Sequence, residues 1–468
     1  MAASTQRSSR GQLPGLFERR PALLATAVAL GVLGGVLAER RPSAAVIVCI
    51  VLGAVIALAM LGERAFPWAI VLVSVVPWYP LVGQLAEAPV VPQKVLCAAI
   101  AAAPLVPWLW SLALGGQRTR PSRGALLMGV LFASLALLIY ESLGSLNAVI
   151  DSKVVGFVFG GVAFLCARRF SSARGWLGSA FAGLVILGLL GADAYLKSPS
   201  NRVGYFVGYP ITYGALVVGL LPAALLFAYR RSRLLAGGLV AGTTALLIFS
   251  ESRSSWVAAT VMLMIAVMLQ ARAGNFRALA AVITSVVILV GLIVSTGTLS
   301  KIVEKKLGAS VATSQSVTHR QWSYGYAFET IGTQPLFGAG APGFASEQSA
   351  ARTSIGALDN GYLSITVDMG LIGLFAVMIP IGVALRVIGR CLRLGVTPRH
   401  ELALALGIVG MAIVTIFYDS FYWAQIDLLL GAMGGALSVR LRTIGSREEA
   451  TQSEPAGRGS PRAIRWAI

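Results

Sequence analysis

Charged side chains are scarce in this sequence. They make up 12% of its 468 residues, whereas hydrophobic residues make up 56%. Soluble domains carry roughly 25% charged and 45–50% apolar residues. The composition therefore excludes a water-soluble globular fold, and most of the chain must lie in an apolar solvent.

Cysteine and histidine are also rare, with four and two copies. Three of the cysteines lie inside apolar runs and none has metal-ligand spacing. His319 and His400 fall on opposite sides of the membrane in the topology given below, and the outside acidic residues show no close pair that would hold a hard cation. We therefore expect no metal site and no cofactor, and no Ser-His-Asp triad unless it uses His319.

Long apolar runs recur along nearly the whole chain, for example over residues 22–38, 44–61, 124–143 and 278–296. Each has about the length that crosses a hydrocarbon core, roughly 17–25 residues. Lipid offers backbone groups no hydrogen-bond partner, so such runs form helices. The sequence predicts an all-α, polytopic transmembrane helical bundle of about 12–14 spans.

A net charge of +19 would suit nucleic-acid binding in a soluble protein, but the distribution of the charges here indicates membrane topology instead. Arginines gather in the N-terminal arm, in alternate connections and in the C-terminal tail, which is the positive-inside pattern. We therefore expect a multi-pass membrane protein with both termini cytoplasmic and no nucleic-acid partner. Arg40 and Arg41 fall outside in this topology, either as headgroup contacts or because the first two spans are misplaced.

The same reading divides the chain into five parts. They are a cytoplasmic arm (1–21), a transmembrane bundle (22–297), an extracytoplasmic loop (298–359), C-terminal transmembrane helices (360–441) and a cytoplasmic tail (442–468) whose composition predicts disorder. Loops beyond roughly 12–15 residues are usually functional or disordered, and we expect this one to be functional. Within it, Trp322, Tyr326, Phe328 and Ile331 predict a helix at the membrane surface, and residues 334–344 predict a tight loop.

Of the arginines that fall on the outside in this topology, three come from distant parts of the sequence and could converge. Arg202 precedes the span that opens at Pro210, Arg253 lies in a turn between two spans, and Arg320 lies in the long loop. Guanidinium groups hold phosphate through a fixed fork of donors, so their convergence would suit a diphosphate. The alternative for each is interfacial anchoring.

Asp359 stands where the long loop enters the next span, followed by Asn360, Gly361 and Tyr362. A carboxylate at that boundary suits a general base. The alternative is a helix cap, since Asp at a helix start satisfies free backbone N–H groups. Asp368 and Asp419, near or within spans, are further candidates.

Several short motifs stand in a fixed order between residues 201 and 374. They are Arg202 before a span, Ser252-Arg253-Ser254-Ser255-Trp256 at a span start, Arg320-Gln321-Trp322, Pro335-Leu336-Phe337-Gly338, Asp359-Asn360-Gly361-Tyr362-Leu363 and Gly370-Leu371-Ile372-Gly373. As an ordered set they resemble the O-antigen ligase and O-antigen polymerase family.

That resemblance implies a metal-independent bacterial glycosyltransferase of the all-helical, multi-span type, without a cofactor. Its donor would be an undecaprenyl-diphosphate-linked glycan on the outer face of the cytoplasmic membrane. The other expected partners are a glycan or lipid acceptor, membrane lipids and other polysaccharide-assembly proteins. By the same resemblance Arg202, Arg253 and Arg320 would hold the lipid diphosphate, Asp359 would deprotonate the acceptor hydroxyl, and Asn360, Tyr362 and Trp322 would support the site.

One position departs from the ligase pattern, which has His immediately before the Asn where this chain has Asp359. The departure favours a polymerase, of O-antigen or exopolysaccharide type, over an O-antigen ligase proper. Two other readings stay open. A secondary transporter or flippase of lipid-linked glycans predicts charges near the membrane midplane and repeat symmetry, and an inactive relative would serve as an assembly partner.

Overall fold

The computed structural model describes residues 65–76, 97, 153–170, 173–198, 202–207, 209–272, 315–340, 358–394 and 399–452. Within these ranges the chain forms ten α-helices and short 3-10 turns, without a strand. The helices are α3 (Ala65–Val75), α9 (Lys153–Phe170), α10 (Trp176–Lys197), α11 (Pro210–Arg231), α12 (Arg233–Ser250), α13 (Arg253–Arg272), α16 (Gln315–Thr333), α18 (Gly361–Leu394), α19 (Arg399–Ile416) and α20 (Ala424–Gln452). The predicted all-α fold is confirmed for this part of the chain.

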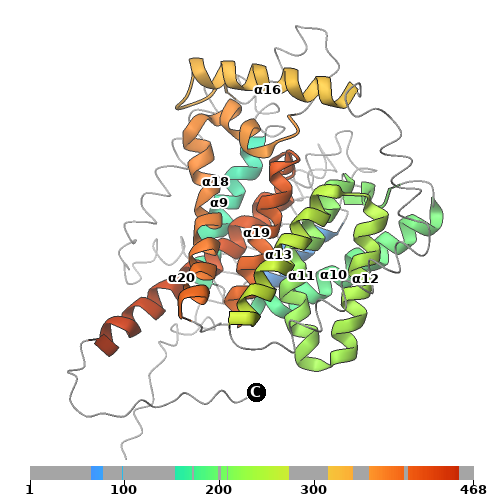
Figure 1. The fold of residues 1–468 in the computed structure, drawn as a ribbon, viewed down its shortest axis with the longest axis vertical. Coiled ribbons are helices and arrows are strands. Elements are labelled where there is room, and N and C mark those ends of the chain that lie inside the picture. Colours follow the sequence, from blue (N-terminus) through green and yellow to red (C-terminus); the bar gives the residue numbers. More distant parts are fainter. Residues whose placement is uncertain are drawn as a thin grey trace, which may run out of the picture.

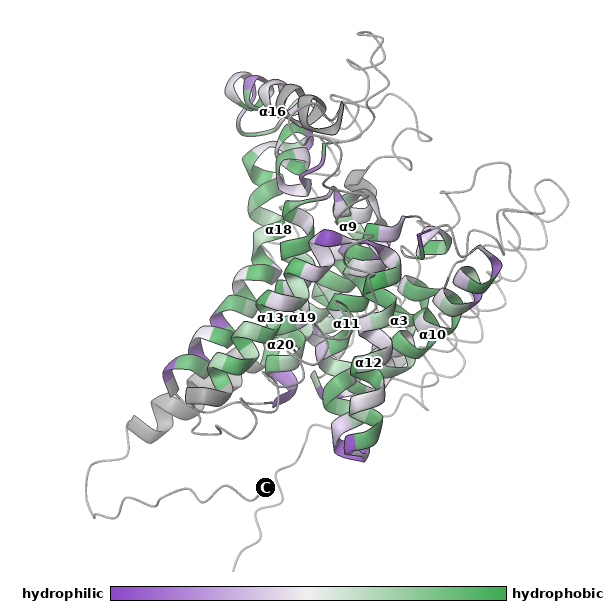
Figure 2. Ribbon diagram, turned by 45° about the vertical axis from the view of Figure 1, so that its right-hand side comes forward, coloured by the Kyte–Doolittle hydropathy of each residue, from purple (hydrophilic) through white to green (hydrophobic). Residues whose placement is uncertain are grey.

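Five of these helices, α10, α11, α12, α18 and α19, are long and apolar enough to cross a membrane. Hydrophobic residues run along the length of the bundle, and hydrophilic residues gather towards its ends (Figure 2). Large apolar side chains such as Leu189, Met264 and Phe375 are exposed on its sides, which suits contact with lipid. The chain is therefore a polytopic helical membrane protein, as the sequence predicted.

Helix α11 lies inside the bundle and packs against α10, α12, α13 and α19. Every residue from Thr212 to Leu220 is buried. On the other side, α9 runs along α20, and Gly160 and Gly431 meet at their contact, where a side chain on Gly431 would collide with the Gly160 backbone. Small residues at such positions let membrane helices approach closely, which increases the van der Waals contact between them.

One end of the bundle gathers segments that are far apart in sequence. The starts of α11, α13, α18 and α20 and the ends of α12 and α19 lie there, and α16 crosses above them (Figure 1). We call it the α16 end. The turn between α11 and α12, with the exposed Arg230, Arg231 and Arg233, lies at the opposite end. This separation fits the predicted charge pattern, and which end faces the cytoplasm stays a prediction.

Helix α18 is broken near its start. Gly370 has φ 65° and ψ −165°, a conformation open essentially to glycine alone, and it separates a short first segment from the long second one. The Pro335–Ala339 segment fills the break. The Ala339 N–H donates to the Val367 carbonyl (2.7 Å), and the Leu371 and Ile372 N–H groups donate to the carbonyls of Pro335 (2.8 Å) and Leu336 (3.4 Å). The backbone groups that the break releases are thus paired again.

Helix α16 confirms the predicted helix in the long loop, and the turn at 335–337 confirms the start of the predicted tight loop. α16 lies across the bundle, at a steep angle to α18 (Figure 1). Ser323 and Ala327, one helical turn apart, are buried, and Phe328 is 62% exposed. Ala327 packs with Leu358 and Val367, and the partly buried Tyr326 and Ile331 pack against the same cluster.

Parts of the predicted organisation lie outside the described residues. These include the arm at 1–21, the first spans with Arg40 and Arg41, and most of the tail. Helix α20 extends to Gln452, past the expected end of the spans at residue 441. The five-part division and the total number of spans stay predictions.

Candidate active site

Arg202 lies in the segment between α10 and α11 and is held against the end of α12. Its Nε donates to the Ser250 carbonyl and its Nη2 to the Glu251 carbonyl, both at 3.1 Å. These carbonyls end a helix, where cations are favoured. The structure therefore joins Arg202 to the turn that carries Arg253, and two of the guanidinium's five N–H donors are engaged there.

The turn itself is tightly built. Glu251 adopts a left-handed conformation (φ 50°) and ends α12, and Arg253 begins α13. The Ser252 hydroxyl bonds to the Ser255 hydroxyl (2.7 Å) and the Ser254 hydroxyl (3.3 Å), all three being buried. Arg253 is exposed among these buried serines. The Ser-Arg-Ser-Ser pattern thus turns its serines inward and presents its arginine at the surface of the α16 end.

Arg320 lies in the first half of α16, the helix that crosses above this end of the bundle. The helix is fixed to α18 through Ala327 against Leu358 and Val367. The side chains of Arg320 and Trp322 lie outside the described residues. Their contribution to a shared site with Arg202 and Arg253 stays a prediction.

Asp359 is half-buried and stands one residue after the fully buried Leu358, at the entry to α18. The cap bonds at this helix start come from Asn360, whose Oδ1 accepts from the N–H groups of Tyr362 (3.0 Å) and Leu363 (3.1 Å). The sequence had offered capping as the alternative role of Asp359. Asn360 meets that need, as its residue type favours.

Tyr362, the second residue of α18, is fixed by two contacts. Its hydroxyl donates to the Ala412 carbonyl of α19 (2.9 Å), and its ring meets Phe421 edge-on at 5.9 Å between centroids. A tyrosine held on both sides locks the first turn of α18 against α19. Tyr362 therefore positions the helix start that carries Asp359.

A second carboxylate lies close to this helix start. Asp419, only 2% exposed, accepts a 2.8 Å hydrogen bond at Oδ2 from the hydroxyl of Ser364 in the first turn of α18. Asp419 was a candidate from its place at the end of a span. The pairing with Ser364 was not predictable, since the two residues are distant in sequence and only the packing of α18 against α19 brings them together.

The comparison with known families now bears on this geometry. A family model described as O-antigen ligase matches residues 238–378. This part of the chain is similar to the O-antigen ligase family. The match confirms the resemblance carried by the sequence motifs, and it gives the protein a function of the membrane glycan ligase or polymerase type, with lipid-linked glycans as its general class of substrate. No curated protein matches the chain closely enough to count as a relative.

The O-antigen ligase domain includes Arg253, Arg320 and Asp359, and Arg202 lies before it. It also includes both halves of the contact at the break in α18. The Pro-Leu-Phe-Gly and Gly-Leu-Ile-Gly motifs, which the sequence offered only as matching patterns, bind one another through backbone hydrogen bonds. They hold α16, and Arg320 with it, to the helix that begins beside Asp359.

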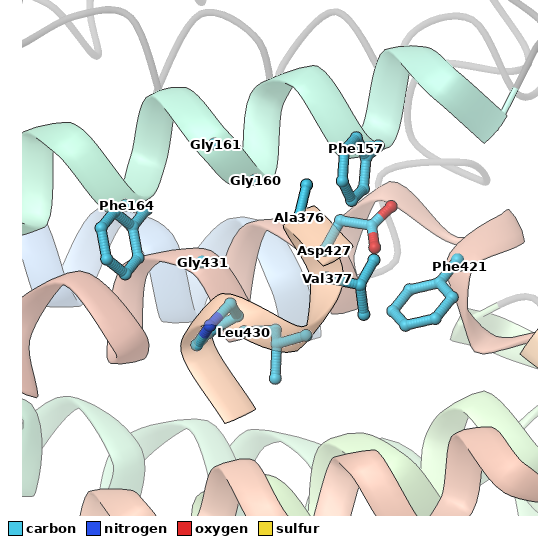
Figure 3. A pocket seen from close by; sticks show the side chains of 11 residues that line it. Phe157, Gly160, Gly161, Phe164, Ala376, Val377, Phe421, Asp427, Leu430 and Gly431 are labelled. Atoms are coloured by element: carbon cyan, nitrogen blue, oxygen red, sulfur yellow. The ribbon is translucent and has the colours of Figure 1, made fainter. Parts of the chain in front are cut away.

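A further carboxylate, Asp427, is buried inside the bundle. Asp427, in the first turn of α20, is 4% exposed and lines a mostly apolar hollow between α9, α18 and α20 (Figure 3). Phe157, Val377 and Phe421 surround it there. The sequence analysis did not single out Asp427. The signal was present as an acidic residue in the first turn of an apolar span.

Proposed function

We propose that this protein is a membrane glycosyltransferase that polymerises a glycan carried on undecaprenyl diphosphate, at the outer face of the bacterial cytoplasmic membrane. The polymer is a polysaccharide of the O-antigen or exopolysaccharide type. The observation that carries the proposal is the α16 end itself. Within or beside the residues that match the O-antigen ligase model, an anchored arginine, an exposed arginine and a half-buried carboxylate lie at one end of a membrane bundle.

In the proposed reaction Arg202, Arg253 and Arg320 bind the diphosphate of the donor lipid. The acceptor hydroxyl attacks the anomeric carbon of the donor sugar as Asp359 takes its proton. The new glycosidic C–O bond forms, the bond from the anomeric carbon to the phosphate oxygen breaks, and undecaprenyl diphosphate leaves as an anion. The arginines stabilise its developing charge, which is the task that a metal ion performs in other glycosyltransferases.

Arg202 has a double task in this scheme. Two of its donors hold the α12–α13 turn, and the remaining N–H groups are available to a phosphate. Arg253 follows that turn as the exposed first residue of α13. The two hydrogen bonds thus fix the Arg202 guanidinium beside the turn from which Arg253 extends. Fixing these groups in advance lowers the free-energy cost of binding a diphosphate.

The choice of polymerase rests on Asp359, which stands where the ligase pattern has histidine. An O-antigen ligase proper is the second candidate, and the family match favours both equally.

The test is glycan polymer length in cells that produce Asp359→Asn or Arg320→Ala, with the membrane level of each variant measured beside wild type. Arg230→Ala is the matched control, because Arg230 is an exposed arginine at the opposite end of the bundle. We expect the first two variants to lose long chains at normal protein level and the control to keep them. Unchanged polymer length in Asp359→Asn and Arg320→Ala would contradict the proposal and favour a role in transport or assembly.

The orientation has its own test. Gly325 on α16 and Ser232 in the α11–α12 turn are both exposed, and they lie at opposite ends of the bundle. In whole cells, a membrane-impermeant maleimide should label Gly325→Cys and spare Ser232→Cys. Labelling of Ser232→Cys alone would put the α16 end in the cytoplasm and exclude the proposed donor.

A further inference from the structure

Four aromatic side chains gather at the α16 end from two separate connections. Tyr205 and Tyr209 come from the segment between α10 and α11, and Tyr418 and Trp423 from the segment between α19 and α20. The Tyr209 and Tyr418 rings stack almost in parallel, 7° apart with centroids at 5.5 Å. Tyr205 stands edge-on to Tyr209 at 5.9 Å. We call these four residues the aromatic platform.

The platform is a built feature rather than a chance surface contact. The Trp423 Nε1 donates to the Tyr418 hydroxyl (2.9 Å), which fixes the position of that hydroxyl. Beneath it, the buried Gln425 donates from Nε2 to the Val207 carbonyl (3.0 Å) and ties the two connections together. The platform is therefore rigid, and Tyr205, 56% exposed, is its open face.

In the chain, the two segments of the aromatic platform adjoin the proposed diphosphate site on one side and the helix that follows the proposed base on the other. Tyr205 and Tyr209 follow Arg202 in one short segment, next to the turn that carries Arg253. Tyr418 precedes Asp419, which holds Ser364 in the first turn of α18, and Asp359 stands just before that helix. The Tyr209–Tyr418 stack and the Ser364–Asp419 hydrogen bond thus connect the segment that carries Arg202 to the first turn of α18.

We propose that the aromatic platform is a sugar-binding subsite, in which a sugar ring of the glycan packs against the exposed face of Tyr205. This inference rests on the proposed function and deepens it. One face of a sugar ring carries mainly C–H groups and packs well on an aromatic ring, and its hydroxyls need polar partners close by. The tyrosine hydroxyls of the platform supply those partners, because tyrosine combines an apolar body with a polar tip.

The Tyr418 hydroxyl suits this task in particular. Burial raises the pKa of Tyr418 to about 12, and the neighbouring Asp419 acts in the same direction. The hydroxyl therefore keeps its proton at neutral pH. It accepts from Trp423 and retains its own proton to donate to a sugar oxygen.

The test uses the purified full chain in lipid nanodiscs and three probes. They are the lipid-linked oligosaccharide of a producing strain, the same oligosaccharide released by mild acid, and undecaprenyl diphosphate without sugar. The variants are Tyr205→Ala, whose exposed position spares the fold, and the conservative Tyr205→Phe. The control is Tyr229→Ala, because Tyr229 is 55% exposed, is followed by Arg230 and Arg231, and lies at the opposite end of α11.

We expect Tyr205→Ala to weaken oligosaccharide binding about ten-fold, as loss of a stacked ring does, and Tyr205→Phe to stay within about two-fold of wild type. Binding of undecaprenyl diphosphate should not change. A loss confined to the lipid-linked probe identifies the donor sugar as the occupant, and a loss confined to the released probe identifies the acceptor.

Two results would overturn the subsite. In the first, Tyr205→Ala binds both oligosaccharides as wild type does, which would leave the tyrosines as membrane-interface aromatics. In the second, all three probes weaken together, which would make the platform a scaffold. Failure of the proposed function is read separately, from unchanged polymer length in cells that produce Asp359→Asn and Arg320→Ala, because a flippase would also bind the lipid-linked probe.

Discussion

The Ala339 N–H donates a 2.7 Å hydrogen bond to the Val367 carbonyl, in the place where an unbroken helix would use the N–H of Leu371. The Leu371 N–H turns instead to the Pro335 carbonyl. The Leu371 and Ile372 N–H groups thus bind loop carbonyls in place of helical ones, and a loop segment is inserted at the break. The contact joins the long loop to the helix that carries Asp359 at its start.

Gly370→Ala should break this contact. The φ of 65° is strained for any residue with a side chain, and a Cβ here would collide with the Leu336 backbone. We expect a loss of about 1–3 kcal/mol from the backbone strain alone, with more from the collision, seen as a lower unfolding midpoint in detergent. Gly382→Ala, in the same helix with open space around its Cβ, should match or exceed wild type. Equal midpoints for the two variants would contradict the model of the break.

Arg202 and Arg253 should differ in what their loss costs. Arg202→Ala removes two charge-assisted bonds to carbonyls and should lower stability by about 1.5–3 kcal/mol, and Arg202→Lys should recover only part, since an ammonium lacks the guanidinium fork. Arg253→Ala, at an exposed position, should change stability by less than about 0.5 kcal/mol. Polymer length should nevertheless fall in the Arg253 variant. Thermal unfolding beside glycan gels separates the two roles, and a destabilised Arg253→Ala would assign that arginine a structural task.

We expect Ala327→Phe to disrupt the packing of α16 against α18. Ala327 is fully buried against Leu358 and Val367, and overpacking a filled site costs about 1–3 kcal/mol. Because Arg320 lies on the same helix, we expect faster tryptic cleavage in α16 together with shorter glycan chains. Gly325→Ala, on an open face of α16, should change neither. Faster cleavage with normal polymer would show that the placement of α16 does not matter for activity.

Tyr418 should make stability fall at alkaline pH. Its pKa is about 12 in the folded protein and 10.0 in the unfolded chain, so the unfolded state loses its proton first. This contribution is complete below pH 10 and is lost as pH rises to about 12. Tyr418→Phe should have a lower unfolding midpoint at pH 8, because Trp423 loses its acceptor, and a smaller further decline between pH 10 and 12. Parallel wild-type and variant curves across that window would contradict the burial of this hydroxyl.

The sequence predicted some local features of the site well. Pro210 was expected to open a span, and it lies at the first turn of α11. The Gly- and Pro-rich segment after Gln334 was expected to form a loop, and it does so as far as it is described. Both predictions succeed because proline and glycine act on their own backbone, whatever surrounds them.

Predictions that needed a partner were less complete. The apolar residues of α16 predicted a helix at the membrane surface and did not predict its contacts, in which the buried Ala327 packs with Leu358 and Val367. The sequence predicted Arg202 to be a phosphate ligand or an interfacial anchor. In the structure its guanidinium binds carbonyl groups at the end of α12. Hydropathy reports how apolar a segment is, and it does not say which helix face meets which neighbour.

The sequence by itself determined that this protein is a helical membrane protein of the O-antigen ligase type, since apolar runs in lipid have to form helices and the motifs keep their order along the chain. Only the tertiary structure decided that Pro335 and Leu336 pair with a break in α18, that Ser364 binds Asp419 and that Tyr209 stacks on Tyr418. These partners lie far apart in the sequence. Their meeting depends on how whole helices pack, and local periodicity carries no information about that.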